Sequence, residues 1–130
     1  MQQYKNNIIG AVLCCILLLM VLSGCGSAEK SIKRGDAALA LGEYAEAAAQ
    51  YKRAYGQTSA TDKKRRGFVA YKMGDAYRRY GNVARAVGAF QNAARYGVKD
   101  TLTYLYLGDM LRQQGNYKGA ENAYRAYADS

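Results

Sequence analysis

The chain has 130 residues, room for one domain at most, and its net charge of +9 comes from 19 lysines and arginines against 10 acidic residues. Histidine, tryptophan and proline are absent, which removes the commonest general acid–base group. The 13 tyrosines and abundant alanines favour closely packed small helices over a sheet.

The chain begins with a short polar segment that carries Lys5, followed by an apolar run at residues 8–22 and then by small residues. A membrane-spanning helix needs about 20 apolar residues, so this run is short for that purpose. A polar start, an apolar centre and small residues form the pattern of a secretory signal. We therefore predict that residues 1–24 are a signal peptide, with a short uncleaved anchor as the alternative.

Cys25 is the one cysteine that would remain after such a cleavage, because Cys14 and Cys15 lie inside the apolar run. A single thiol cannot form an internal disulfide. An unoccupied thiol is also a liability in an exported protein. Cys25 is therefore a candidate for modification.

The sequence LSGC at residues 22–25 resembles a bacterial lipobox, in which Leu, a small residue, Gly and Cys follow the apolar run. The resemblance implies cleavage before Cys25, lipidation of its sulfur and acylation of the new amino terminus. Several acyl chains exceed the two signals or so that stable membrane anchoring requires. The residue after the cysteine is Gly26 and not aspartate. In this class of lipoproteins, that implies sorting to the outer membrane. Residues 25–27 would form the lipidated terminus and a short linker.

Residues 28–130 repeat one pattern three times. A Gly-Asp pair starts at Gly35, Gly74 and Gly108, and another glycine follows each of these seven residues later. The intervals are 39 and 34 residues, and 34 is the period of the tetratricopeptide repeat (TPR). The third copy carries the TPR signature at Tyr104, Leu107, Gly108, Leu111, Ala120, Tyr124 and Ala126. This resemblance implies an all-α solenoid of three helix-turn-helix repeats, at about 28–61, 67–100 and 101–130.

Glycines mark the expected ends of helices. We predict tight turns between paired helices at Gly42, Gly81 and Gly115, and left-handed helix caps at Gly56 and Gly97. The Gly-Asp glycine lies inside each first helix, where glycine costs about 1 kcal/mol against alanine. We expect another backbone to approach closely there.

The longer first interval contains a five-residue insertion within 57–64. Ser59 and Asp62 in this segment could form a capping box for the helix that follows.

The concave surface of a solenoid, lined by its first helices, is where partners bind. Aromatic and arginine side chains are frequent interface anchors. The alternative is that the tyrosines belong to the core and the charges are only solvated. The predicted groove residues are Tyr71, Lys72, Asp75, Arg78, Arg79, Tyr106, Asp109, Arg112 and Gln113.

Asp36, Asp75 and Asp109 recur at one position of the repeat, which raises the question of a metal site or an acid–base set. Neighbouring helices are about 10 Å apart, too far for a shared small cation. We interpret the three aspartates as polar groups that tie adjacent helices together.

A basic cluster lies near the start of a predicted helix, where cations oppose the helix dipole. Such a placement suggests anionic head groups or an acidic partner, and the alternative is an ordinary soluble face. Nucleic acid would suit the charge, but an exported lipoprotein would not meet it. The cluster consists of Lys63, Lys64, Arg65 and Arg66.

No set of residues has the pattern of an active site, since there is no histidine, the remaining thiol would be lipidated, and no serine–lysine or carboxylate pair has a supporting motif. We predict a protein that is not an enzyme, with no metal, no small-molecule substrate and no cofactor besides the lipid on Cys25.

The segment 63–106 is similar to the TPR block of PorE-like lipoproteins, part of the type IX secretion and gliding machinery of Bacteroidota. Those proteins add a β-propeller and an OmpA-like domain after this block, and the 130 residues of this sequence correspond to the front end alone. The resemblance implies a scaffold that is lipid-anchored in the outer membrane, on its periplasmic face, and that recruits envelope proteins. A pilotin-like assembly chaperone is the alternative, and an accessory of a peptidoglycan-associated enzyme is a weaker one.

Overall fold

The computed structural model describes residues 1–98 and 102–130, and within these the side chains of all but 17–25. All the regular secondary structure in the described part is α-helical, and short turns and loops connect the helices. Its elements are α1 (Gln2–Ala40), α2 (Tyr44–Gln57), α3 (Lys63–Tyr80), α4 (Val83–Arg95), α5 (Thr103–Gln113) and α6 (Tyr117–Ala128).

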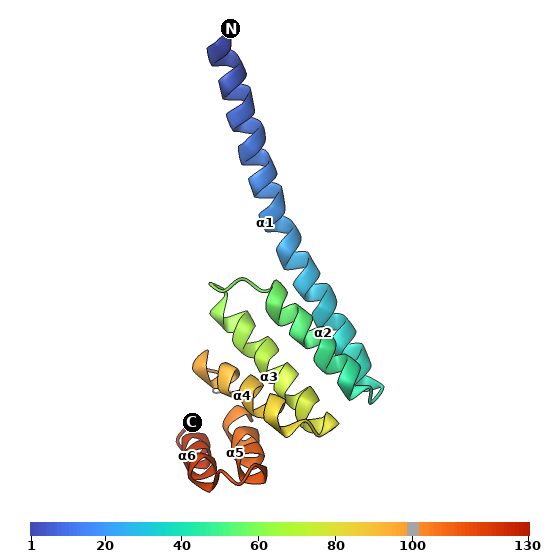
Figure 1. Ribbon diagram of the computed structural model, residues 1–130, viewed down its shortest axis with the longest axis vertical. Coiled ribbons are helices and arrows are strands. Elements are labelled where there is room, and N and C mark those ends of the chain that lie inside the picture. The colour runs from blue at the N-terminus through green and yellow to red at the C-terminus, as the bar shows by residue number, and fades with distance from the viewer. Residues whose placement is uncertain (99–101) are drawn as a thin grey trace.

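These helices form three antiparallel hairpins, α1–α2, α3–α4 and α5–α6, stacked one on the next (Figure 1). Each helix packs mainly on its neighbours in chain order, so the core is a continuous layer between successive helices. Small alanines allow this close approach, and Ala47, Ala54, Ala76, Ala86 and Ala93 are all fully buried. The predicted all-α solenoid is confirmed.

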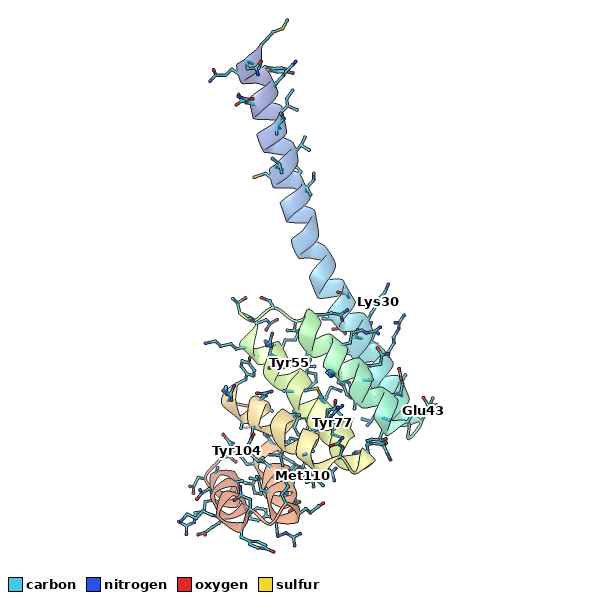
Figure 2. All side chains as sticks on the ribbon, viewed as in Figure 1. Lys30, Glu43, Tyr55, Tyr77, Tyr104 and Met110 are labelled. Carbon is cyan, nitrogen blue, oxygen red and sulfur yellow. The ribbon has the colours of Figure 1, made fainter. Side chains whose placement is uncertain are left out.

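The first helix is longer than expected. The sequence predicts a first repeat that starts at about residue 28, but α1 begins at Gln2 and continues to Ala40. Residues 2–16 project from the body, and their side chains are exposed to solvent (Figure 2). Burial begins at Ala28, which is 1% exposed. The folded body therefore starts three residues after Cys25, whose side chain lies outside those that the structure describes.

In the part of the chain whose side chains are described, no helix is both long and apolar enough to cross a membrane.

The predicted turns between paired helices are confirmed, because Gly42, Gly81 and Gly115 adopt left-handed φ angles of 75°, 89° and 78°. Gly97 also has a left-handed φ of 73° after α4, as expected. Gly56 does not cap α2. It lies within the last turn of that helix, which continues to Gln57.

A tyrosine or phenylalanine ring occupies the space beside the glycine of each first helix. A Cβ added to Gly74 would lie 2.8 Å from the Phe90 ring, and one on Gly35 would lie 2.6 Å from the Tyr51 ring. In the third hairpin the same relation joins Gly108 to Tyr124, at 2.5 Å. The expectation of a neighbouring backbone was wrong, since it is the aromatic side chain of the second helix that needs the space.

The insertion lengthens α3 at its start. This helix begins eleven residues before Gly74, whereas α5 begins five residues before Gly108. Asp62 is the N-cap of α3, and its carboxylate accepts a hydrogen bond from the Arg65 backbone N–H at 3.1 Å. The predicted capping box was wrong, because the Ser59 hydroxyl pairs with that of Thr61 at 2.8 Å in the loop.

Candidate partner-binding surface

The repeated aspartates make two kinds of contact. Asp36 accepts a hydrogen bond from the Tyr51 hydroxyl at 2.6 Å, and Asp109 accepts one from the Tyr124 hydroxyl at 2.7 Å. Each of these bonds ties the first helix of a hairpin to the second, as predicted. Asp75 has no such partner on α4, because Phe90 stands at the equivalent position and lacks a hydroxyl.

Asp75 instead binds two arginines of its own helix. Its carboxylate accepts from Arg78 Nη2 at 2.6 Å and from Arg79 Nε at 2.9 Å, and the residue is only 9% exposed. The nearby carboxylate raises the pKa of Arg79 further above its already high value. The shared carboxylate therefore holds both guanidinium groups in place.

Aromatic rings connect Arg78 and its helix to the neighbouring helices. The Phe90 ring centroid lies 6.1 Å from that of Tyr71 and 5.9 Å from that of Tyr106, so the three rings join α3, α4 and α5. The Arg78 guanidinium lies 4.1 Å from the Tyr106 ring centroid, a cation–π contact. Burial, followed by the charge of Asp75, raises the pKa of Tyr71.

The structure thus brings together five of the predicted groove residues in one connected set, which we call the arginine cluster: Tyr71, Asp75, Arg78, Arg79 and Tyr106. The remaining predicted residues lie to either side of it. Lys72 donates to Asp36 of the first hairpin at 2.7 Å, and Arg112 and Gln113 are exposed at the end of α5.

The four residues of the predicted basic cluster do not share one environment. Arg66 lies over the Tyr55 ring at 4.2 Å and donates to the Tyr96 hydroxyl at 3.2 Å and to the Thr58 carbonyl at 3.1 Å. It therefore links α2, the loop after it and the end of α4. A hydrogen bond with Tyr55, followed by the contact with Arg66, lowers the pKa of Tyr96 despite partial burial.

The other members of the cluster are closer to solvent. Arg65 forms ion pairs with Glu29 at 3.8 Å and Asp62 at 3.9 Å, while Lys63 and Lys64 are exposed. Arg66 of this cluster thus stabilises the packing between helices, a role that the sequence pattern did not reveal.

One surface feature was missed by the sequence analysis. A hollow of about 880 Å³, which we call the α1–α3 groove, lies between α1, the start of α3 and residues 96–98. Its apolar lining includes Ile32, Phe68 and Val98. The insertion before α3 was the available signal, since it places Phe68 on helical turns that the third repeat lacks.

Within the described side chains, no three carboxylate or thiol groups gather closely enough to hold a metal ion. The arrangement offers fixed cations and aromatic faces, which suit binding of another macromolecule.

The stacked antiparallel hairpins and the periodic glycine–aromatic contacts define a helical repeat solenoid. Residues 30–62 and 71–130 match the model of the Tetratricopeptide repeat family. The matched residues make up most of the chain, which therefore belongs to the tetratricopeptide repeat family.

The structure is similar to the crystal structure of the TPR domain of Arabidopsis FLU, with a TM-score of 0.71. The two share 18% sequence identity, over 82% of this chain and 95% of that chain. At this identity the likeness concerns the fold. No curated protein matches the sequence.

Proposed function

We propose that the protein is a lipid-anchored scaffold of the bacterial outer membrane whose repeats bind another envelope protein. TPR solenoids are typical interaction modules and seldom catalytic, and the arginine cluster is the observation that carries the proposal. Its charges and rings are held in place before any partner arrives, so little side-chain entropy is lost on binding.

The lipobox-like sequence supports the anchoring part of the proposal. Cys25 stands three residues before Ala28, the first buried position among the described side chains, so a lipid on it would hold the body close to the membrane surface. Neither a metal nor a further cofactor is needed for such a role. The resemblance to PorE-like lipoproteins favours a partner in a secretion or peptidoglycan-linked complex.

Photocross-linking in intact cell envelopes tests the binding part. Tyr71 and Tyr106 pack against Phe90, so the photoreactive residue is better placed at the exposed positions Arg79 and Gln113. A matched control is Gln91, which is exposed on α4. Adducts with one envelope protein from the first two positions, and not from Gln91, support the proposed surface.

Charge reversal provides an independent test. The double variant Arg79→Glu, Arg112→Glu should lose capture of the cross-linked partner, while Arg53→Glu, an exposed arginine on α2, should keep it. Equal capture by both variants would exclude Arg79 and Arg112 from the binding site. A partner that co-purifies in fixed stoichiometry indicates a scaffold, whereas capture of unassembled client alone indicates the pilotin-like chaperone.

A further inference from the structure

The α1–α3 groove exists because the insertion extends α3. The added turns of α3 face the segment of α1 that follows Cys25, and residues 96–98 also line the groove. Its volume of about 880 Å³ falls within the range of about 300–1,000 Å³ that is typical of ligand pockets. The groove is therefore large enough for a ligand.

Two ion pairs cross the groove from α1 to α3. Glu29 pairs with Arg65 at 3.8 Å, and Asp36 pairs with Lys72 at 2.7 Å. The partners are seven residues apart on both helices, so the pairs are separated by about 10 Å along the helix axes. Each acidic group is balanced by a basic one, so these pairs give the groove no net charge to attract a charged ligand.

The apolar lining lies between the two ion pairs in sequence on both helices. Ile32 is almost fully buried and contributes to the apolar wall, whereas the Phe68 side chain remains 45% exposed. Val98 adds a further apolar contact from the loop after α4. A partly exposed aromatic ring in a concave site with balanced charges favours an apolar ligand.

We propose that the α1–α3 groove binds an acyl chain attached to Cys25. This inference rests on the proposed lipidation of that residue. Cys25 precedes Glu29, which lines the groove, by four residues, or about 6 Å along a continuous helix. An acyl chain that starts there needs no linker to reach the groove, and the methylene stems of Lys72 and Arg65 extend its apolar surface. With one chain in the groove and the others in the bilayer, the solenoid would lie at the membrane surface.

A photoreactive lipid tests the proposal on the full chain. Cells that produce the protein are fed a palmitic acid analogue with a diazirine within the chain and an alkyne at its end. After illumination, the monomeric protein is isolated and its labelled peptides are mapped by mass spectrometry. We expect internal adducts on the peptides that contain Phe68 or residues 96–98, in addition to the label on Cys25.

Phe68→Glu should lower the yield of groove adducts about tenfold, because a charge that must be desolvated replaces an apolar contact. The label on Cys25 should not change. The matched control is Tyr80→Glu, at the opposite end of α3, where an exposed aromatic is changed in the same way. It should leave the adducts intact.

The outcomes separate the two proposals. Two outcomes would overturn the groove assignment without contradicting the lipid anchor. In one, Cys25 is labelled but its acyl chain cross-links only to phospholipid. In the other, the groove adducts persist in Phe68→Glu. A Cys25 that carries no label would overturn the proposed lipidation itself, and the groove assignment with it.

Discussion

The Tyr51 hydroxyl donates a 2.6 Å hydrogen bond to the Asp36 carboxylate and so joins the two helices of the first hairpin. The third hairpin repeats this bond between Tyr124 and Asp109, also fifteen residues apart. The second hairpin has Phe90 in place of the tyrosine. The aspartate of the repeat therefore joins the two helices in the outer hairpins. In the middle hairpin the equivalent residue, Asp75, positions two arginines instead.

Removing this hydroxyl should weaken the first hairpin. Tyr51→Phe leaves the ring beside Gly35 but deprives Asp36 of its partner across the hairpin, and we expect a loss of about 1–2 kcal/mol of unfolding free energy. Urea unfolding followed by circular dichroism measures it. Tyr124→Phe is the matched control and should cost less, because Tyr124 is only partly buried. A Tyr51→Phe protein as stable as the parent would show that the bond contributes nothing.

Stability should fall at alkaline pH. Burial, and then the hydrogen bond to Asp36, raises the pKa of Tyr51 above its usual value of 10.0. The unfolded chain releases this proton near pH 10 while the folded chain retains it, so the stabilisation is complete below about pH 10 and is lost as pH rises toward the folded-state pKa.

The measurement is the urea midpoint from about pH 8 to pH 11.5, across the tyrosine range. The decline should be shallower in Tyr51→Phe, with a residual slope from Tyr71 and Tyr124, whose pKa values are also raised. Identical slopes in the parent and the variant would contradict the role given to Tyr51.

Two glycine-to-alanine changes should alter the free energy of unfolding in opposite directions. In Gly74→Ala the new methyl group would meet the Phe90 ring at 2.8 Å, and overpacking of this kind costs about 1–3 kcal/mol. In Gly88→Ala, within α4, nothing lies within 4 Å, so the helix should gain about 0.5–1 kcal/mol. Thermal unfolding of both variants checks the pair. A stabilising Gly74→Ala would mean that the ring moves aside freely.

Arg66 should matter for folding and Lys64 should not. Arg66→Lys keeps the charge but loses the planar group that spans the Tyr55 ring, the Tyr96 hydroxyl and the Thr58 carbonyl, which we expect to cost about 1–3 kcal/mol. Lys64→Ala changes an exposed side chain and should stay within about 0.5 kcal/mol of the parent. Equal urea midpoints for the two variants would show that Arg66 contributes no more to stability than an exposed surface lysine.

Cys25→Ala tests the anchor directly. Without the thiol, metabolic acyl labelling should disappear, and the protein should leave the membrane fraction or accumulate as the unprocessed precursor. Acyl labelling and fractionation of cell envelopes measure both effects. Cys14→Ala, in the predicted signal peptide, is the control and should be processed normally. Normal labelling in Cys25→Ala would refute the lipobox interpretation.

The hairpins and their turns were predictable because they depend on local patterns. The seven-residue spacing of glycines and the helical spacing of alanines and tyrosines are enough to place α2, α4 and α6 and the turns before them. The aspartates of the outer hairpins were also interpreted correctly, since a polar residue that recurs once per repeat needs a partner within the repeat.

The contacts between repeats were not predictable in the same way. Arg66 looked like one of four equivalent cations, and its environment depends on Tyr55 and Tyr96 in other helices. Phe68 gave no periodic signal, because its exposure in a groove follows from how far the insertion extends α3. The sequence indicated that another group lies close to the glycine of each first helix. Which group it is depends on how the two helices of the hairpin pack.

The two ion pairs across the α1–α3 groove bear on the shape of the whole solenoid. They join α1 directly to α3, whereas α2 packs between the two hairpins, and they lie at the surface, where salt screens charges over about 8 Å at physiological ionic strength. The packing angle between the first and second hairpins should therefore change more with salt concentration than the angle between the second and third hairpins.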